Sequence, residues 1–181
     1  MIPATPLLEI SLRNDTTLAA ALGAQGVRYL SVAEPVSSYA AIDVTTLIAR
    51  LADQADPRLR EALIPLFLLH PDLAEQAPGL IQRLPPPAAD ALRHLYTAAV
   101  YLQRLWLSTL RMHLGSFSLL PDHFGQAHYH LPAPDVKFGE AGLRALAALY
   151  EDKTGLDWLS VYESTMNLFL LQLGLEQHYH G

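Results

Sequence analysis

Three of the eight histidines of the chain lie close together, in the stretch DHFGQAHYHLPAPD at residues 122–135. Imidazole is a frequent metal ligand, and in an extended segment the side chains of His128 and His130 would point to the same side. His123 and a nearby aspartate could complete such a site. The chain has no HxxxH or HExxH motif to anchor a metal, and hydrogen-bonded or solvent-exposed histidines explain the same letters. We therefore predict no metal and no other cofactor, with His123, His128 and His130 as the candidate ligands of a metal-binding alternative.

A second group of side chains recurs at helical spacing along residues 88–114: Arg93, Tyr101, Arg104 and Arg111. On one helix they form a stripe opposite the apolar face, and three guanidinium groups on one stripe could bind phosphates or an acidic partner. A solvated face with local salt bridges is the plainer interpretation. If the stripe has a function, the sequence predicts a partner-binding surface at these four residues.

Signatures of catalysis are missing. The chain contains no cysteine, which excludes disulfides, thiolate zinc sites, iron–sulfur clusters and cysteine nucleophiles. Glycine-rich phosphate loops, GxSxG elbows and Walker-type lysines are also absent from the sequence. Glu163 and Asn167, four residues apart on an apolar segment, could be buried catalytic groups, but the spacing favours an outward polar strip or a hydrogen-bonded pair. The sequence thus favours a non-enzymatic protein.

Composition narrows the choice of partner. The 181 residues, 51% of them hydrophobic, suit a single domain, and the net charge of −6 repels nucleic acid and anionic membranes. The first residues lack the pattern of a signal peptide, and no run reaches the ~18 apolar residues of a membrane span. We expect a cytoplasmic protein whose partner is another protein or a second copy of itself.

The elements that must position these residues are mostly helices. The predicted fold is mainly α: a single-domain helical bundle of about six helices with a small extended N-terminal element. The predicted organisation is a mixed or extended element at 1–35, a helical core at 43–114, a long His-, Pro- and Gly-rich loop at 116–138 and C-terminal helices at 139–181.

Local signals set the expected boundaries. Alternation at 7–12 and strand-favouring residues at 26–33 predict two short strands or an extended arm, with a short helix capped by Asp15 between them. Asp43 and Asp56 are expected to cap helices.

Within the helices, Pro65 should kink the helix that begins at Pro57. Residues 88–114 predict one continuous helix with Trp106 in the core, and residues 156–176 predict a helix that is apolar around most of its circumference.

These observations favour a non-enzymatic protein-interaction module, an accessory subunit or regulator of a larger prokaryotic assembly; an acidic, antitoxin-like inhibitor is one version. The first alternative is a His/carboxylate metal-binding helical enzyme centred on the 122–135 loop. The second is a small-ligand-binding domain gated by residues 116–138.

Overall fold

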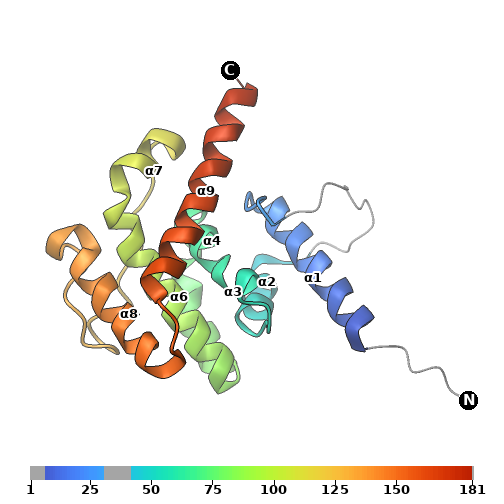
Figure 1. The fold of residues 1–181 in the computed structure, drawn as a ribbon, viewed down its shortest axis with the longest axis horizontal. Coiled ribbons are helices and arrows are strands. Elements are labelled where there is room, and N and C mark those ends of the chain that lie inside the picture. Colours follow the sequence, from blue (N-terminus) through green and yellow to red (C-terminus); the bar gives the residue numbers. More distant parts are fainter. Residues whose placement is uncertain (1–6, 31–41, 181) are drawn as a thin grey trace, which may run out of the picture.

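Helices form almost all the regular structure of the chain (Figure 1). The computed structural model describes residues 7–30 and 42–180, with the side chains of 15–30 and 42–179. The helices are α1 (Leu7–Ala24), α2 (Val44–Ala52), α3 (Pro57–Glu61), α4 (Leu63–Leu69), η1 (Pro71–Gln76), α5 (Ala77–Arg83), α6 (Pro86–Leu105), α7 (Leu107–Leu114), η2 (Val136–Gly139), α8 (Glu140–Thr154) and α9 (Trp158–His180). No β-strand occurs in these ranges, and the mainly α-helical, single-domain fold confirms the predicted fold class. None of the helices in the described part combines the length and the hydropathy that crossing a membrane requires.

Two aspartates start helices as predicted. Asp43 has extended backbone angles and its carboxylate accepts a hydrogen bond from the amide of Thr46. Asp56 accepts from the amide of Arg58, and Pro57 takes the first position of α3, where its missing N–H costs nothing. Each cap satisfies an amide that the helix itself leaves without a partner.

Pro65 divides the predicted helix over 57–70. Proline cannot donate to the carbonyl four residues earlier, that of Glu61, and its ring crowds that carbonyl. The helix is interrupted at Ala62 (φ −62°, ψ −13°), and regular bonding resumes when the amide of Leu66 donates to the Ala62 carbonyl over 3.1 Å. The predicted kink is confirmed as the boundary between α3 and α4.

The continuous helix predicted for 88–114 is wrong, because the chain leaves helical geometry at Trp106 (φ −103°, ψ 17°). No proline or glycine lies near the break. After it, α7 packs against α9, where His113 Nδ1 and Gln177 Oε1 are 3.0 Å apart. Trp106, predicted to lie in the core, is partly buried and packs against the edge of the core. The break accompanies the packing of α7 on α9, which local periodicity does not record.

The extended structure predicted at the N-terminus is not observed in the described residues. Residues 7–12 belong to α1, because a six-residue apolar pattern fits helical spacing as well as alternation. Asp15 therefore lies inside α1 instead of capping it. The helix ends at Ala24. Gly26, two residues later, has a φ of 94° that suits glycine, and the amide of Val27 donates back to the carbonyl of Leu22. Residues 26–30 form no strand, and 31–33 lie outside the described residues.

Helix α6 lies at the centre of the fold, in contact with α2, α4, α5 and α8. Its residues 94–103 are all buried, including Tyr96 and Tyr101, which have no exposed surface. Gly142 allows α8 to approach closely, since a Cβ at that position would overlap the ring of Tyr101.

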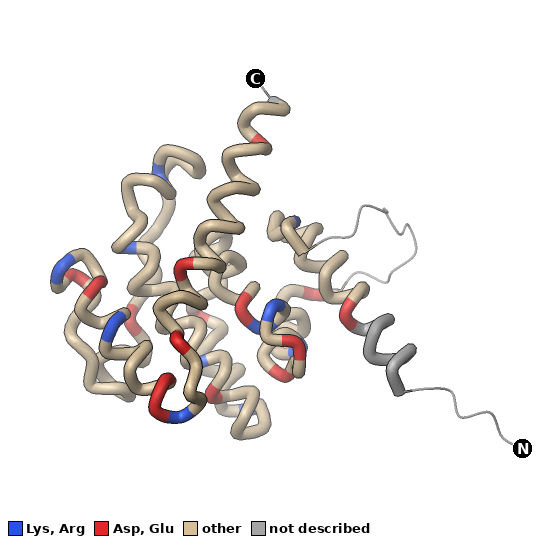
Figure 2. The backbone as a smooth tube through the Cα atoms, viewed as in Figure 1, with Lys and Arg blue, Asp and Glu red and all other residues tan. Residues whose placement is uncertain are grey.

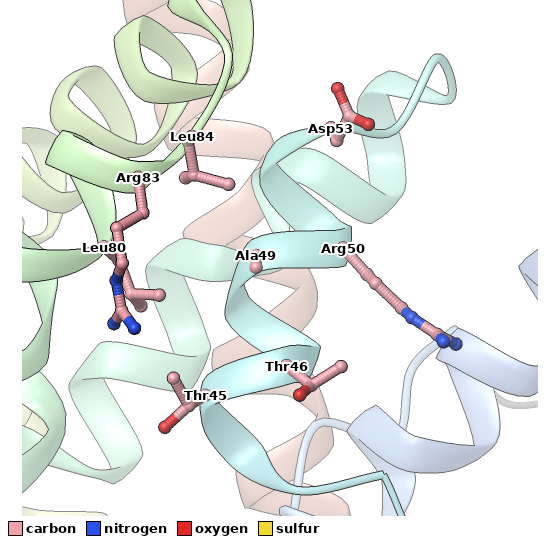
Figure 3. A pocket seen from close by; sticks show the side chains of 8 residues that line it. All are labelled: Thr45, Thr46, Ala49, Arg50, Asp53, Leu80, Arg83 and Leu84. Carbon is pink, nitrogen blue, oxygen red and sulfur yellow. The ribbon is translucent and has the colours of Figure 1, made fainter.

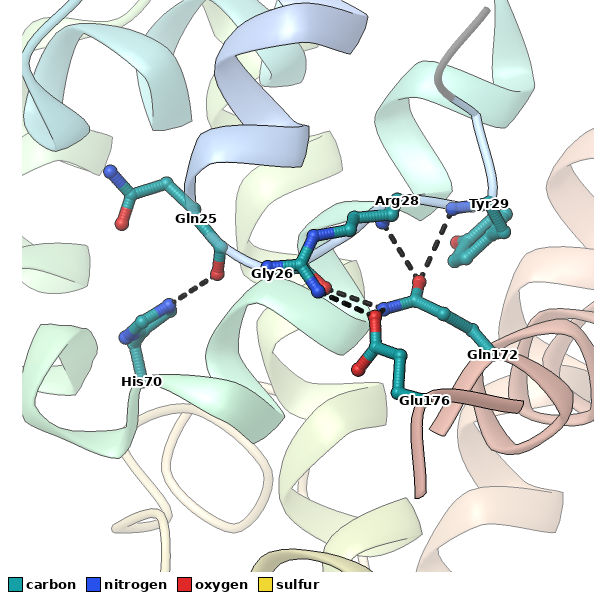
Figure 4. Close-up of polar contacts among 7 residues, drawn as sticks. All are labelled: Gln25, Gly26, Arg28, Tyr29, His70, Gln172 and Glu176. Atoms are coloured by element: carbon teal, nitrogen blue, oxygen red, sulfur yellow. Dashed lines mark hydrogen bonds and ion pairs between the residues drawn. The ribbon is translucent and has the colours of Figure 1, made fainter. Parts of the chain in front are cut away.

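Helix α9 is held against the N-terminal part of the chain by Gln172 (Figure 4). The side-chain carbonyl of Gln172 accepts hydrogen bonds from the backbone amides of Arg28 and Tyr29 over 2.8 and 3.2 Å. Its side-chain NH₂ group donates to the backbone carbonyl of Gly26 over 2.7 Å. The Arg28 guanidinium lies 2.6 Å from the Glu176 carboxylate. The buried side-chain amide of Gln172 thus forms hydrogen bonds with three backbone groups and holds the inner face of α9 against residues 26–29.

Candidate functional site

The candidate metal ligands are not brought together. His123 stacks on Tyr96 with ring centroids 5.5 Å apart, and its Nε2 lies 4.0 Å from the Glu75 carboxylate. His128 and His130 are exposed; His128 lies in a turn, and His130 has φ 56°. Across residues 7–30 and 42–180, no three His, Asp or Glu side chains are placed to hold a metal ion. A shared site for His128 and His130 required an extended segment, which this loop is not.

The segment 115–135 contains no helix, but it is tied to α6. The hydroxyl of Tyr96 donates to the carbonyl of Pro121, and that of Tyr101 to the carbonyl of Pro132, each over 2.7 Å. Gln103 accepts from the amide of Leu120 over 2.7 Å. These anchors give no support to a loop that opens and closes over a ligand.

Tyr101 does not belong to a partner-binding surface, because it is fully buried beneath this loop. Its inclusion in the predicted arginine surface is contradicted by this position. Arg104, three residues later, is half-buried and donates from Nη1 to the carbonyl of Val100 over 3.0 Å. Burial lowers the pKa of its guanidinium, against the opposing effect of Asp122.

The other two arginines of the predicted stripe, Arg93 and Arg111, lie in different environments. Arg93 is half-buried, with its guanidinium 6.0 Å from the ring centre of Phe124 and 4.0 Å from the Asp90 carboxylate. Arg111 is exposed on α7, beyond the break at Trp106. The four residues therefore do not form one continuous exposed stripe.

Glu163 and Asn167, considered as buried catalytic groups, are both exposed on α9. They form an outward polar strip, the plainer of the two interpretations. No catalytic role follows from their geometry.

A buried histidine absent from the sequence-based candidates, His94, lies at the centre of an aromatic cluster. Its ring is parallel to that of Tyr150, with centroids 3.5 Å apart, and meets Trp158 edge-on at 4.4 Å. Its Nε2 shares a 2.6 Å hydrogen bond with the hydroxyl of Tyr162. His94 is 3% exposed, so a substrate cannot reach the ring in this structure.

Beside His94, a chain of hydroxyl groups leads to Asp90. Since a carboxylate can only accept, Tyr150 donates to Asp90 over 2.8 Å, which leaves Tyr129 to donate to Tyr150 over 2.8 Å. Burial raises the pKa of both tyrosines well above their usual value, so both keep their protons. Lys153 Nζ, 4.0 Å away, faces the Asp90 carboxylate.

Burial also lowers the pKa of His94 to about 3, with a smaller contribution from the positive charges of Lys153 and Arg60. His94 is therefore neutral at pH 7 and cannot serve as a general acid there. The cluster joins α6, α8 and α9 and acts in packing. A sequence signal exists: His94 is followed directly by the apolar Leu95 and Tyr96 within the helix predicted to be central, where a buried imidazole must be neutral or paired.

The solvent side of α9 carries exposed apolar side chains that we name the outer stripe: Leu168, Leu171, Leu175 and Tyr179, which are 48%, 62%, 51% and 86% exposed. Steps of three and four residues place them on one side of the helix, opposite the buried Tyr162, Met166, Phe169 and Leu173. The stripe is about 16 Å long at ~1.5 Å per residue. The C-terminal end of α9 extends beyond its neighbouring helices (Figure 1).

The outer stripe is also uncharged. Residues 164–175 include no Asp, Glu, Lys or Arg, and this part of α9 is tan in Figure 2. Gly174 lies among them, and a Cβ there would meet nothing within 4 Å, so packing among the described residues does not require glycine. A glycine inside a helix costs about 1 kcal/mol relative to alanine.

A surface hollow of about 430 Å³ between α2 and α5 is a weaker candidate (Figure 3). It contains two arginines, Arg50 and Arg83, which could bind an anion if they converged. Figure 3 shows Arg50 pointing away from Arg83, and the Arg83 Nε donates to the carbonyl of Gly79 over 3.3 Å. The hollow therefore lacks a convergent anion site.

Comparison of the chain with protein-family models, with curated proteins and with solved structures gave no match.

Proposed function

We propose that the chain is a non-enzymatic protein-interaction module that docks through the outer stripe of α9. The observation that carries the proposal is the exposure of Leu168, Leu171 and Leu175 on one side of a single helix. Exposed apolar residues that are contiguous mark contact surfaces more often than scattered ones. An apolar helix face is also a common form of peptide and protein recognition.

The occupant that fits the outer stripe best is the same face of a second copy. A protein of net charge −6 is repelled by its own copy, but residues 164–175 bring no like charges together. In an antiparallel pair centred near Leu171, Leu168 of one copy meets Leu175 of the other, and the two Glu163 carboxylates lie at opposite ends. Such two-fold contacts use one surface twice.

Gly174 supports the same contact. The described structure gives no packing reason for glycine at this position, and a residue without a side chain lets another backbone approach. Self-association through one helix face suits an accessory subunit or a regulator. Because the outer stripe is short, we expect association in the micromolar range or weaker.

The test is the solution mass over a range of protein concentrations, measured by light scattering. The wild type should rise above the 19.9 kDa of one chain, while Leu168→Ser/Leu171→Ser/Leu175→Ser should stay there. A matched control, Leu119→Ser/Leu149→Ser/Leu156→Ser, removes three exposed leucines that lie outside the outer stripe and should behave as the wild type.

Gly174→Leu separates helix stability from contact, since it adds bulk where the monomer has space. It should weaken association without lowering the melting temperature. A wild type that remains at 19.9 kDa at every concentration would rule out a second copy as the occupant. Equal association by the stripe variant and the control variant would rule out α9 as the surface.

A further inference from the structure

A second hollow, of about 400 Å³, lies where α6, α8 and α9 meet at the α6–α7 break. Its apolar lining consists of the buried Leu102, Leu143 and Tyr162 and the more exposed Leu105, Trp106 and Leu159. Cavities of a few hundred Å³ with apolar walls are the size of small-molecule sites. None of its lining residues comes from the 116–138 loop, so it differs from the gated site considered from the sequence.

Trp106, which lines this hollow, lies at the break between α6 and α7. The sequence predicts an uninterrupted helix here, with no proline or glycine to end it, yet the backbone leaves helical geometry at this residue. The indole lines the hollow and is partly buried. Breaks in regular structure that local sequence does not demand concentrate at functional sites.

The wall of the hollow formed by Tyr162 is held rigidly in the structure without a ligand. Tyr162 has no exposed surface, and its hydroxyl shares the 2.6 Å hydrogen bond with His94. The His94 ring is itself held between Tyr150 and Trp158. A rigid wall lowers the entropy cost of binding, because the side chains that line the site are already ordered.

Three charged side chains line the hollow: Glu140, Arg144 and Glu163. Arg144 Nε donates to the Glu140 carboxylate over 2.9 Å, so these two charges offset each other. Among the described residues, Glu163 has no ion-pair partner within 4.0 Å, which leaves a net negative charge. The indole face of Trp106 adds to this, since aromatic faces attract cations.

We infer that this hollow, the Trp106 pocket, binds an apolar ligand that carries one positive charge. The apolar part would lie against Leu102, Leu143 and Trp106, and the cation would lie beside Glu163. An alkylammonium compound and the lysine side chain of an amphipathic peptide share this chemistry. This inference is independent of the outer stripe, whose four residues are not part of the pocket lining.

Tryptophan fluorescence measures the binding. The chain has two tryptophans, so Trp158→Phe leaves Trp106 as the reporter. Octylammonium, 1-octanol and octanoate have equal chain lengths and differ in charge, so titrating each below its aggregation concentration isolates the effect of charge. A short Leu- and Lys-containing peptide tests the side-chain source, and calorimetry with the wild type checks that Trp158→Phe has not changed the site.

Octylammonium should bind more tightly than 1-octanol, and octanoate most weakly. Glu163→Gln should weaken octylammonium by about two- to fivefold, the range of an exposed ion pair, and leave 1-octanol unchanged. In calorimetry, which does not depend on the indole signal, Trp106→Ala should abolish measurable binding of both, and Leu171→Ser in the outer stripe should change neither. Binding of either the free amine or the peptide supports the inference and identifies the source.

Three results would overturn it. One is no binding of any probe at millimolar concentration in the wild type. Another is equal affinity for octylammonium and octanoate. The third is binding that survives Trp106→Ala but is lost in Leu171→Ser, which would place the ligand on α9.

Discussion

The burial of His94 predicts that the protein loses stability as the pH falls below neutral. In the folded state the pKa of His94 is about 3, because burial disfavours the imidazolium. In the unfolded chain its pKa is near the ordinary value of 6.5. The unfolded chain thus binds the proton more readily, and the stability that neutral His94 provides is fully present above pH 6.5. It is lost progressively as the pH falls from 6.5 to 3.

The size of the loss follows from these two pKa values. One pKa unit corresponds to about 1.4 kcal/mol, so the full effect is about 5 kcal/mol below pH 3. Between pH 7.5 and pH 5 the same relation gives about 2 kcal/mol. This narrower window is the useful one, since few aspartates and glutamates take up protons above pH 5.

Urea denaturation followed by circular dichroism at pH 7.5 and pH 5 measures the loss. His94→Gln keeps a group that can hydrogen-bond to Tyr162 but cannot titrate in this range. Relative to the wild type, its unfolding free energy should depend on pH by about 2 kcal/mol less across the window. His130→Gln, which removes an exposed histidine, is the matched control and should behave as the wild type. If His94→Gln loses as much stability as the wild type, His94 is not held neutral by burial.

Three further substitutions test the packing. Gly142→Ala should lower the unfolding free energy by more than about 2 kcal/mol, because the new Cβ would overlap the buried ring of Tyr101. The control Gly79→Ala should not destabilise the protein, since a Cβ there meets no atom within 4 Å. Equal effects of the two substitutions in urea denaturation would contradict the α6–α8 contact. Asp43→Ala should cost about 1 kcal/mol through loss of its cap, and an unchanged midpoint would mean that the cap does not form. Trp106→Ala should cost less than the ~3–5 kcal/mol of a buried aromatic, since Trp106 is only partly buried, and a loss in that range would show that it contributes as a full member of the core.

Features with local causes could be predicted from the sequence. The caps at Asp43 and Asp56 depend on hydrogen bonds two or three residues along the chain, and the division at Pro65 depends on its own missing amide hydrogen. The short pattern at 7–12 failed because six residues cannot separate helical spacing from alternation.

Features that depend on packing between distant segments could not be predicted. The break at Trp106 accompanies the packing of α7 on α9, which periodicity within one helix does not record. Tyr101 lay at surface spacing in the sequence, yet the 116–138 loop and α8 cover it, so that α6 is buried on more than one side. For the same reason, the burial of His94 could be inferred from its place in a central helix, but its contacts with Tyr150 and Trp158 could not.

Only part of the outer stripe could be predicted from the sequence. The apolar character of residues 156–176 predicted a helix in need of cover, and α9 does bury one face. Which leucines stay exposed depends on which sides of α9 are covered by α4, α7, α8 and the residues that follow α1. Only the structure shows that Leu168, Leu171 and Leu175 share the uncovered side.

Site-specific photo-cross-linking in cells of the native host tests most directly whether α9 is a contact surface. A photoreactive residue at Leu171 should yield one dominant cross-linked product, whose mass identifies a second copy or another protein. The same residue at Leu149, an exposed leucine of α8, should yield none. No discrete product at position 171, or the same products at both positions, would contradict the proposed interaction module.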